Sequence, residues 1–232
     1  METGALPGLL PGGRPVSDAT AREQTAAGWN FGDLPSAPGR DTTGILAAAR
    51  SGELGALLVG GVELGDLPDP DAALAAIDAA PFVVSLELRE SAVTALADVV
   101  FPVAPVVEKA GSFVNWEGRI RPFGPSLQTN AIPDLRVLAY LADELGVDLN
   151  MTSALVAGDE MARLGLWAGQ RPAFPQQASS RPTSPGKGQA LLAGWRMLLD
   201  AGRLQDGEPH LAGTARVEQH PPARQNGLPL AR

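Results

Sequence analysis

The amino-acid sequence predicts an α/β protein: a Rossmann-like parallel sheet with crossover helices and a β-hairpin, flanked by extended ends rich in Pro and Gly. Three observations support this fold class. From residue 42 onward, short apolar runs alternate with segments of helical periodicity. Residues 112–121 alternate apolar and polar side chains around a Glu-Gly pair. The 27 Gly and 21 Pro residues crowd the two ends of the chain.

Residues 1–41 are expected to form an extended arm, because Pro and Gly recur too often for long regular elements. Only the segment 18–27 could hold a short helix. Two interpretations of this region stay open: an arm that lies on another surface, and plain disorder.

Residues 42–166 are expected to form the α/β domain, which begins with a β-α-β-α-β unit. Helices are predicted at 42–50, at 70–80 with Asp69 as the N-cap and Pro70 in the first turn, and at 90–97. Strands are predicted at 56–59, 82–86 and 99–101. The first of these is a continuous apolar run, as expected for a strand buried on both faces.

The second half of this domain is expected to hold a hairpin and two helices. The hairpin is predicted at 111–124, with Phe113 and Trp116 requiring burial. Pro133 begins an amphipathic helix that ends at Gly146. Its apolar stripe consists of Leu135, Leu138, Ala139, Ala142 and Leu145. A further helix is predicted at 152–164.

Three segments follow the domain. Residues 167–188 are rich in Pro, Gly, Gln and Ser, and we interpret them as a linker. Residues 189–202 carry Leu and Trp at helical spacing, which predicts a helix that must dock on another surface. Residues 203–232 return to Gly, Pro and charge, and are expected to be a disordered tail.

The charge balance argues against several partners. The 18 Lys and Arg residues face 26 Asp and Glu residues, a formal charge of −8, which repels nucleic acid and anionic lipid. No apolar run approaches the roughly 18 residues that a membrane span needs. The N-terminus also lacks the basic start of a secretory signal, so we expect a cytoplasmic location.

The chain contains no cysteine, which excludes disulfides, thiolate catalysis, iron–sulfur ligation and a cysteine ligand to molybdenum from its own residues. The only histidines, His210 and His220, lie in the Pro-rich tail, too few for a usual zinc site. We therefore predict no catalytic, cofactor-binding or metal-binding residues in this chain.

Gly-rich segments suggest phosphate sites only weakly. Gly60-Gly61 follows the first strand, where open α/β sheets place their ligands. However, no G-x-G-x-x-G is present, and Glu63 would repel an anion, so a tight turn is favoured. Residues 186–188, Gly-Lys-Gly, lack the Ser or Thr that follows the Walker lysine.

Charged side chains near the hairpin also have simpler explanations than catalysis. Asp98, Glu108 and Glu117 could be paired carboxylates, but turn and capping roles are favoured. Arg119 and Arg121 could stack on a base or bind a phosphate. The acidic total argues against this, and a structural pair of Arg119 with Glu117 or Glu108 is favoured.

Two stretches resemble the signature of molybdopterin oxidoreductases. They are A-D-V-V-F-P at 97–102 and E-K-A-G-S-F-V-N-W-E-G-R at 108–119. The helix that follows Ile132-Pro133 is also similar to the family's next stretch. This resemblance implies a Rossmann-like domain that, in the full enzymes, forms one wall of the cofactor cleft.

Within that family, the chain resembles the large iron–sulfur subunit, the G subunit, of actinobacterial NADH-quinone oxidoreductases (complex I). Residues 4–13, 55–64 and 202–215 carry this narrower resemblance. It implies a place in the peripheral arm at the inner face of the plasma membrane, with the other hydrophilic-arm subunits as partners. Iron–sulfur clusters are implied only for a cysteine-bearing N-terminal region, which this chain is expected to lack.

The chain departs from the family at the strand ends. Cofactor-binding relatives tend to have G-x-N-P after the first strand, where this chain has G-G-V-E at 60–63. After the second strand, L-R-E-S at 88–91 replaces a Thr-rich turn. Both changes weaken the case for pterin binding. Residues 217–232 resemble nothing in the family, which suggests a truncated or split gene product.

Three functional hypotheses remain open. The first is a non-catalytic structural part of the complex I peripheral arm. The alternative is a fragment of a molybdopterin-dependent oxidoreductase, such as a formate dehydrogenase-like enzyme. The third is a decayed gene product without a stable role.

Overall fold

The computed structural model describes residues 7–171, 186–190 and 210. The chain divides into two units, Met1–Ala173 and Phe174–Arg232, and the helices and strands named below lie in the first. Most of the helix predicted at 189–202 and of the tail predicted at 203–232, His220 included, lies outside the described residues.

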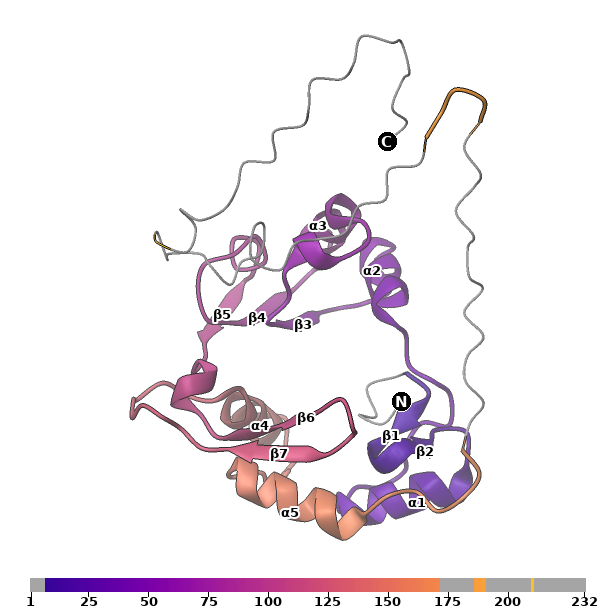
Figure 1. Cartoon of the computed structure of the whole chain (residues 1–232), viewed down its shortest axis with the longest axis vertical. Helices are drawn as coiled ribbons and strands as arrows, with labels where there is room; N and C mark the ends of the chain where they lie inside the picture. Colours follow the sequence, from indigo (N-terminus) through magenta and orange to yellow (C-terminus); the bar gives the residue numbers. More distant parts are fainter. Residues whose placement is uncertain (1–6, 172–185, 191–209, 211–232) are drawn as a thin grey trace. The chain divides into compact units, whose positions relative to one another are not determined.

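A parallel three-stranded sheet forms the centre of the α/β region (Figure 1). Its strands are β3 (Leu57–Gly60), β4 (Val83–Glu87) and β5 (Val99–Pro102), in chain order. Each lies within one residue of its predicted position at either end. This arrangement confirms the predicted α/β fold with crossover connections.

Helices α2 (Thr42–Arg50) and α3 (Pro70–Asp78) lie on one face of this sheet (Figure 1). Asp41 accepts a hydrogen bond from the Gly44 N–H at 2.8 Å, and Asp69 accepts one from the Ala72 N–H at 3.0 Å. These caps satisfy N–H groups that a helix start leaves unpaired. Both helix predictions are confirmed, although α3 ends two residues earlier than expected.

The main hydrophobic core lies between these helices and the sheet. Its buried side chains are Ala49, Leu57, Leu64, Ala73, Ala76, Ile77, Val83 and Val93. A smaller cluster on the opposite face joins Leu86 and Val103 to Val137 of α4 (Asp134–Glu144). The sheet therefore has one well-covered face and one that is covered mainly near its carboxyl end.

The prediction that the first strand is buried on both faces is wrong. Leu57 is buried, but Leu58 is 49% exposed. β3 is an edge strand of the sheet. On the face to which Leu58 belongs, Val137 of α4 packs on Leu86 and Val103 and leaves Leu58 uncovered. The apolar run at 56–59 thus predicts the strand correctly but predicts its burial only in part.

The helix predicted at 90–97 is absent; hydrogen-bonded turns occupy this segment. Ser91 N–H donates to Thr94 Oγ1 at 2.8 Å, and Thr94 N–H donates to Ser91 Oγ at 3.2 Å. These reciprocal bonds form a capping box, and the Ala95 N–H donates to the Ser91 oxygen at 3.1 Å, so the segment begins a single helical turn. It does not continue, because the Asp98 N–H pairs with the Val83 oxygen of the sheet at 2.9 Å. Val93 is fully buried and anchors the turn in the main core.

The hairpin and the two later helices form as predicted. The hairpin consists of β6 (Gly111–Val114) and β7 (Ile120–Phe123), and α5 spans Ala154–Leu164. The apolar stripe expected on α4 is wrong in its details, because Val137 is its buried residue, whereas Leu138 and Leu145 are exposed.

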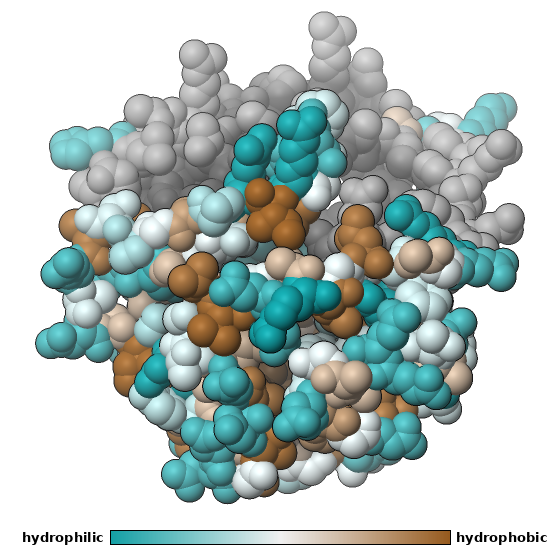
Figure 2. Space-filling model, turned by 90° about the horizontal axis from the view of Figure 1, so that it is seen from below, coloured by the Kyte–Doolittle hydropathy of each residue, from teal (hydrophilic) through white to brown (hydrophobic). Residues whose placement is uncertain are grey.

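Figure 2 shows hydrophobic groups at the surface between hydrophilic ones.

The helix predicted near the start of the chain is confirmed as α1 (Ala19–Gly28), with Asp18 accepting a hydrogen bond from the Ala21 N–H. The preceding residues pair as two short antiparallel strands, β1 (Leu9–Leu10) and β2 (Arg14–Pro15). α1 contacts α5, so the region expected to be an arm packs on the helix at 154–164.

Arg14 holds these distant segments together and is only 3% exposed. Its guanidinium donates to the carbonyl oxygens of Leu164 at 2.7 Å and Gly165 at 2.8 Å, at the carboxyl end of α5. It also donates to Pro11 O and Gln24 Oε1. Burial lowers the pKa of Arg14 because desolvation disfavours the charged form, and these acceptors together with the α5 dipole offset that cost.

Gly12 allows this close approach. Its φ of +73° suits glycine, and a Cβ at this position would lie 2.5 Å from the Gly165 oxygen. The Gly12 carbonyl also accepts a hydrogen bond from the Trp167 N–H at 2.9 Å. Residues 8–18 and 164–167 therefore form one contact, which we call the Arg14 clasp.

Replacing Arg14 should destabilise the fold. Arg14→Met leaves several buried acceptors without donors and should lower the free energy of unfolding by about 2–3 kcal/mol in urea titration of the full chain. Arg40→Met is the matched control, because Arg40 pairs with Glu53 on the exposed surface and should contribute less than about 1 kcal/mol. Equal effects of the two substitutions would contradict the clasp.

Ser85 gives the opposite expectation, because its hydroxyl is fully buried in β4 and has no hydrogen-bond partner among the described residues. Ser85→Ala should leave the free energy of unfolding unchanged or raise it by up to about 1 kcal/mol. Thr25→Val is the control: the Thr25 hydroxyl is buried and donates to the Ala21 oxygen, so its loss should cost about 1 kcal/mol. A loss for Ser85→Ala as large as the control's would show that the hydroxyl is paired.

Candidate functional site

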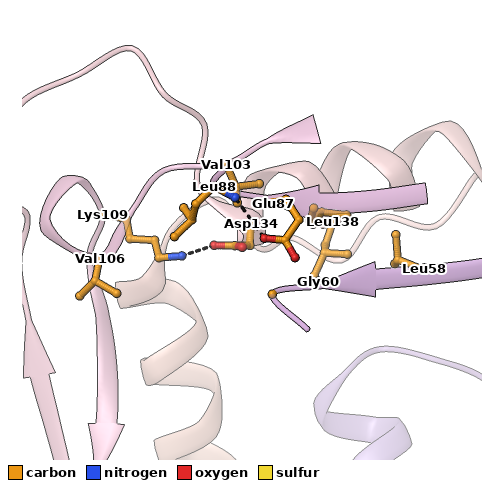
Figure 3. A pocket seen from close by; sticks show the side chains of 11 residues that line it. Leu58, Gly60, Glu87, Leu88, Val103, Val106, Lys109, Asp134 and Leu138 are labelled. Atoms are coloured by element: carbon orange, nitrogen blue, oxygen red, sulfur yellow. Dashed lines mark hydrogen bonds and ion pairs between the residues drawn. The ribbon is translucent and has the colours of Figure 1, made fainter. Parts of the chain in front are cut away.

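A pocket of about 420 Å³ opens at the carboxyl ends of the three parallel strands (Figure 3). We call it the strand-end cleft. The sheet contributes Gly60, Leu86, Leu88 and Val103, and the facing segments contribute Lys109 and Leu138. Open α/β sheets commonly bind ligands at this edge, so it is the candidate site of the chain.

Backbone pairing after β5 brings α4 to this edge. Val103 forms a parallel bridge with Ile132, and the Ala104 N–H donates to the Ile132 oxygen at 3.0 Å. Asp134, the first residue of α4, therefore lies at the strand ends. Lys109 follows the single turn η3 (Val106–Glu108) and lies opposite Asp134.

Three charged side chains line the strand-end cleft among the described residues. The Lys109 ammonium pairs with the Asp134 carboxylate, and both point into the pocket in Figure 3. Glu87, at the end of β4, accepts a hydrogen bond from the Leu88 N–H at 3.3 Å. One ammonium and two carboxylates give this cleft a formal charge of −1.

The Gly60-Gly61 segment bends the chain away from β3. Gly61 has a φ of +61°, and its N–H donates to the Leu86 oxygen at 3.1 Å. This N–H group extends the sheet and is not available to an anion. Nearby, Glu63 accepts a hydrogen bond from the Gly65 N–H at 3.3 Å, so its carboxylate supports the following turn.

The carboxylates considered from sequence have contacts of their own. Asp98 Oδ2 accepts the Val83 N–H at 2.7 Å, and Glu117 Oε2 lies 3.3 Å from Arg119 Nε. The favoured structural pairing of Arg119 is thus confirmed. Glu108 lies in η3, and the described contacts join none of these three carboxylates to another.

The hairpin is ordered by its turn but is not covered. Asn115 Oδ1 accepts the N–H groups of Glu117 and Arg119 at 3.0 and 2.9 Å, and the Phe113 and Phe123 rings stack at 4.9 Å. Nevertheless, Phe113 is 58% and Trp116 93% exposed. Their predicted burial is wrong within this chain, because the strand side chains on both faces of the hairpin are mostly exposed.

Glu87, Lys109 and Asp134 are not predicted as a group from the sequence. Two signals could have drawn attention to them: Glu87 ends a predicted strand, and Asp134 follows the helix-opening Pro133. Their approach depends on the bridge between Val103 and Ile132, which no local pattern predicts.

Other candidate features are plain turns. In the second unit, the Gly186 N–H donates to Gln189 Oε1, and Lys187 lies in the resulting turn. Within the described residues, no group of three His, Asp or Glu side chains could hold a metal ion. None of the described helices combines the length and the hydropathy that crossing a membrane requires.

Comparison with known proteins gives a family match and several relatives. The family model "Molybdopterin oxidoreductase" matches residues 2–144. Proteins named as the G subunit of NADH-quinone oxidoreductase are similar: that of Mycobacterium tuberculosis is 59% identical over 221 residues, and that of Streptomyces coelicolor is 53% identical over 220. A putative formate dehydrogenase of Bacillus subtilis is 31% identical over 170 residues.

The alignments differ in what they cover. They include 94%, 92% and 70% of this chain, respectively. They include only 27%, 26% and 17% of the three relatives. The chain thus spans about a quarter of the length of the first two relatives.

The Lys109–Asp134 pair should stabilise the cleft modestly. Its side chains are 20% and 39% exposed, so solvent screening limits the interaction. A double-mutant cycle of Lys109→Met and Asp134→Asn, followed by urea denaturation, should give a coupling free energy of about 0.5–1 kcal/mol. A coupling of zero would mean that the two side chains do not pair in solution.

Proposed function

The chain belongs to the molybdopterin oxidoreductase family, and from this premise we propose that it is a non-catalytic structural part of the G subunit in the peripheral arm of a respiratory NADH-quinone oxidoreductase. The observation that carries the proposal is the 59% identity to a protein of that name over 94% of this chain. In this proposal, the chain supports electron transport from NADH to quinone but carries no electrons itself.

The family implies a pterin cofactor, which is anionic through its phosphate groups. Such a ligand needs unpaired N–H donors or cations. In the strand-end cleft, Lys109 is paired with Asp134, the Gly61 N–H is bonded to Leu86, and Glu87 adds a negative charge. Asp134 also occupies the positive end of the α4 dipole. These residues do not fit the cofactor, and we assign it no role in this chain.

The absence of cysteine also argues against a redox centre held by this chain. Iron–sulfur clusters in proteins are held mainly by cysteine thiolates, and this sequence contains none. Electron transfer through clusters would therefore have to use ligands from other polypeptide. In this proposal, the chain contributes a surface on which other subunits pack.

The hairpin is the part of that surface that most needs a partner. A two-stranded hairpin is marginally stable in water unless another layer packs on it. Phe113, Val114, Trp116 and Ile120 are all exposed. We propose that other subunits of the hydrophilic arm cover these side chains, at the cytoplasmic face of the membrane.

A second candidate is a fragment of a molybdopterin-dependent oxidoreductase of the formate dehydrogenase type. The 31% identity to a putative formate dehydrogenase over 70% of the chain favours it. The two candidates differ in one chemical respect: the second requires a pterin in the assembled protein, and the first does not.

Co-purification tests the structural role. A tagged full chain expressed in an actinobacterial host should recover subunits of the hydrophilic arm. Trp116→Ser should lower that recovery by about 30-fold, because buried Trp anchors commonly contribute 2 kcal/mol or more at interfaces. Since Trp116 is 93% exposed in the free chain, the unfolding free energy of the variant should stay within about 0.5 kcal/mol of the wild-type value.

Leu145→Ser is the control for this experiment, because Leu145 is also a large exposed apolar residue but belongs to the end of α4 and not to the hairpin. It should leave the recovery unchanged. A chain that stays a lone monomer in the host, or equal recovery with Trp116→Ser and the wild type, would contradict the proposal.

A further inference from the structure

We propose that the strand-end cleft binds the cationic head of a basic side chain, Arg or Lys, presented by a polypeptide segment. The cleft lies where sheets of this type commonly hold ligands, but its charges favour a cation. This inference goes beyond the structural role described above and does not depend on membership of any complex.

The charge of the cleft is the first argument. The only described hydrogen bond to the Glu87 carboxylate comes from the neighbouring Leu88 N–H, and no cation of the described residues pairs with it. Lys109 is already engaged by Asp134. An incoming guanidinium or ammonium would therefore find an uncompensated carboxylate, and charge-assisted hydrogen bonds to carboxylates are stronger than neutral ones.

The apolar walls are the second argument. Leu58, Leu88, Val106 and Leu138 line the cleft and are exposed to solvent. Figure 3 shows these side chains on both sides of the Glu87 carboxylate. Basic side chains pack their methylene stems on apolar surface while the charged head finds a polar partner. The cleft offers both surfaces at once.

The size and the open rim are the third argument. A volume of about 420 Å³ is near the lower end of typical ligand pockets, which run from roughly 300 to 1,000 Å³. It suits one long side chain with some of its backbone. At Gly61 an added Cβ would meet nothing within 4 Å, so the rim leaves room for a polypeptide backbone to approach.

The competing ligand class is an anion such as a phosphate. It would meet the carboxylates of Glu87 and Asp134, and the Lys109 ammonium is already paired, so its binding is electrostatically unfavourable. Cation and anion binding therefore give opposite outcomes in a single set of titrations.

The test uses the full chain and the capped pentapeptide Ala-Leu-Arg-Leu-Ala, with binding followed by two-dimensional NMR. We expect saturable shifts of the Gly61 and Leu88 amide signals. A peptide with citrulline in place of the arginine, which has nearly the same shape without the charge, should bind at least about 10-fold more weakly.

Glu87→Gln should weaken binding of the arginine peptide by about 10-fold or more. It should retain the fold, because the glutamine side chain keeps an oxygen that can accept the Leu88 N–H. Glu53→Gln is the control, since Glu53 lies outside the cleft and pairs with Arg40; it should leave binding unchanged.

Three results would overturn the inference: no saturable binding of the arginine peptide, equal binding of the citrulline peptide, or shifts of the same amides with inorganic pyrophosphate. Failure of the chain to co-purify with other subunits, with peptide binding intact, would count against the proposed structural role alone.

Discussion

The ion pair between Lys109 and Asp134 determines which charge of ligand the strand-end cleft can bind. It joins the segment before the hairpin to the first turn of α4, and it engages the ammonium that the described residues contribute to the cleft. It also places a carboxylate at the helix end that could otherwise attract an anion. With Glu87 beside it, the carboxyl-end edge of the sheet carries two carboxylates and one ammonium, which is electrostatically unfavourable for an anionic ligand.

The Arg14 clasp plays the corresponding role for the ends of the folded unit. It joins residues 8–18 to the carboxyl end of α5, about 150 positions later in the sequence. Because Arg14 is buried without a carboxylate partner among the described residues, its hydrogen bonds to carbonyl oxygens must be nearly complete. The clasp explains how a segment with many Pro and Gly residues holds a defined conformation.

Local signals predicted most of the fold, and tertiary contacts explain the failures. Asp18, Asp41 and Asp69 each cap the helix that sequence analysis placed after them. The helix predicted at 90–97 stops after one turn capped by Ser91 and Thr94, because the Asp98 N–H pairs with the Val83 oxygen of the sheet. Gly60-Gly61 pointed to the strand ends, but the charged lining there could not be predicted, because Asp134 reaches the pocket through the bridge between Val103 and Ile132.

We propose that this chain provides structure and recognition surface within an oxidoreductase assembly, and that it binds no pterin. The most direct measurement is the molybdenum and pterin content of the complex purified through a tag on this chain, per mole of chain. We predict neither component above trace level. A stoichiometric pterin that is lost when Gly60 and Gly61 are replaced would contradict the claim.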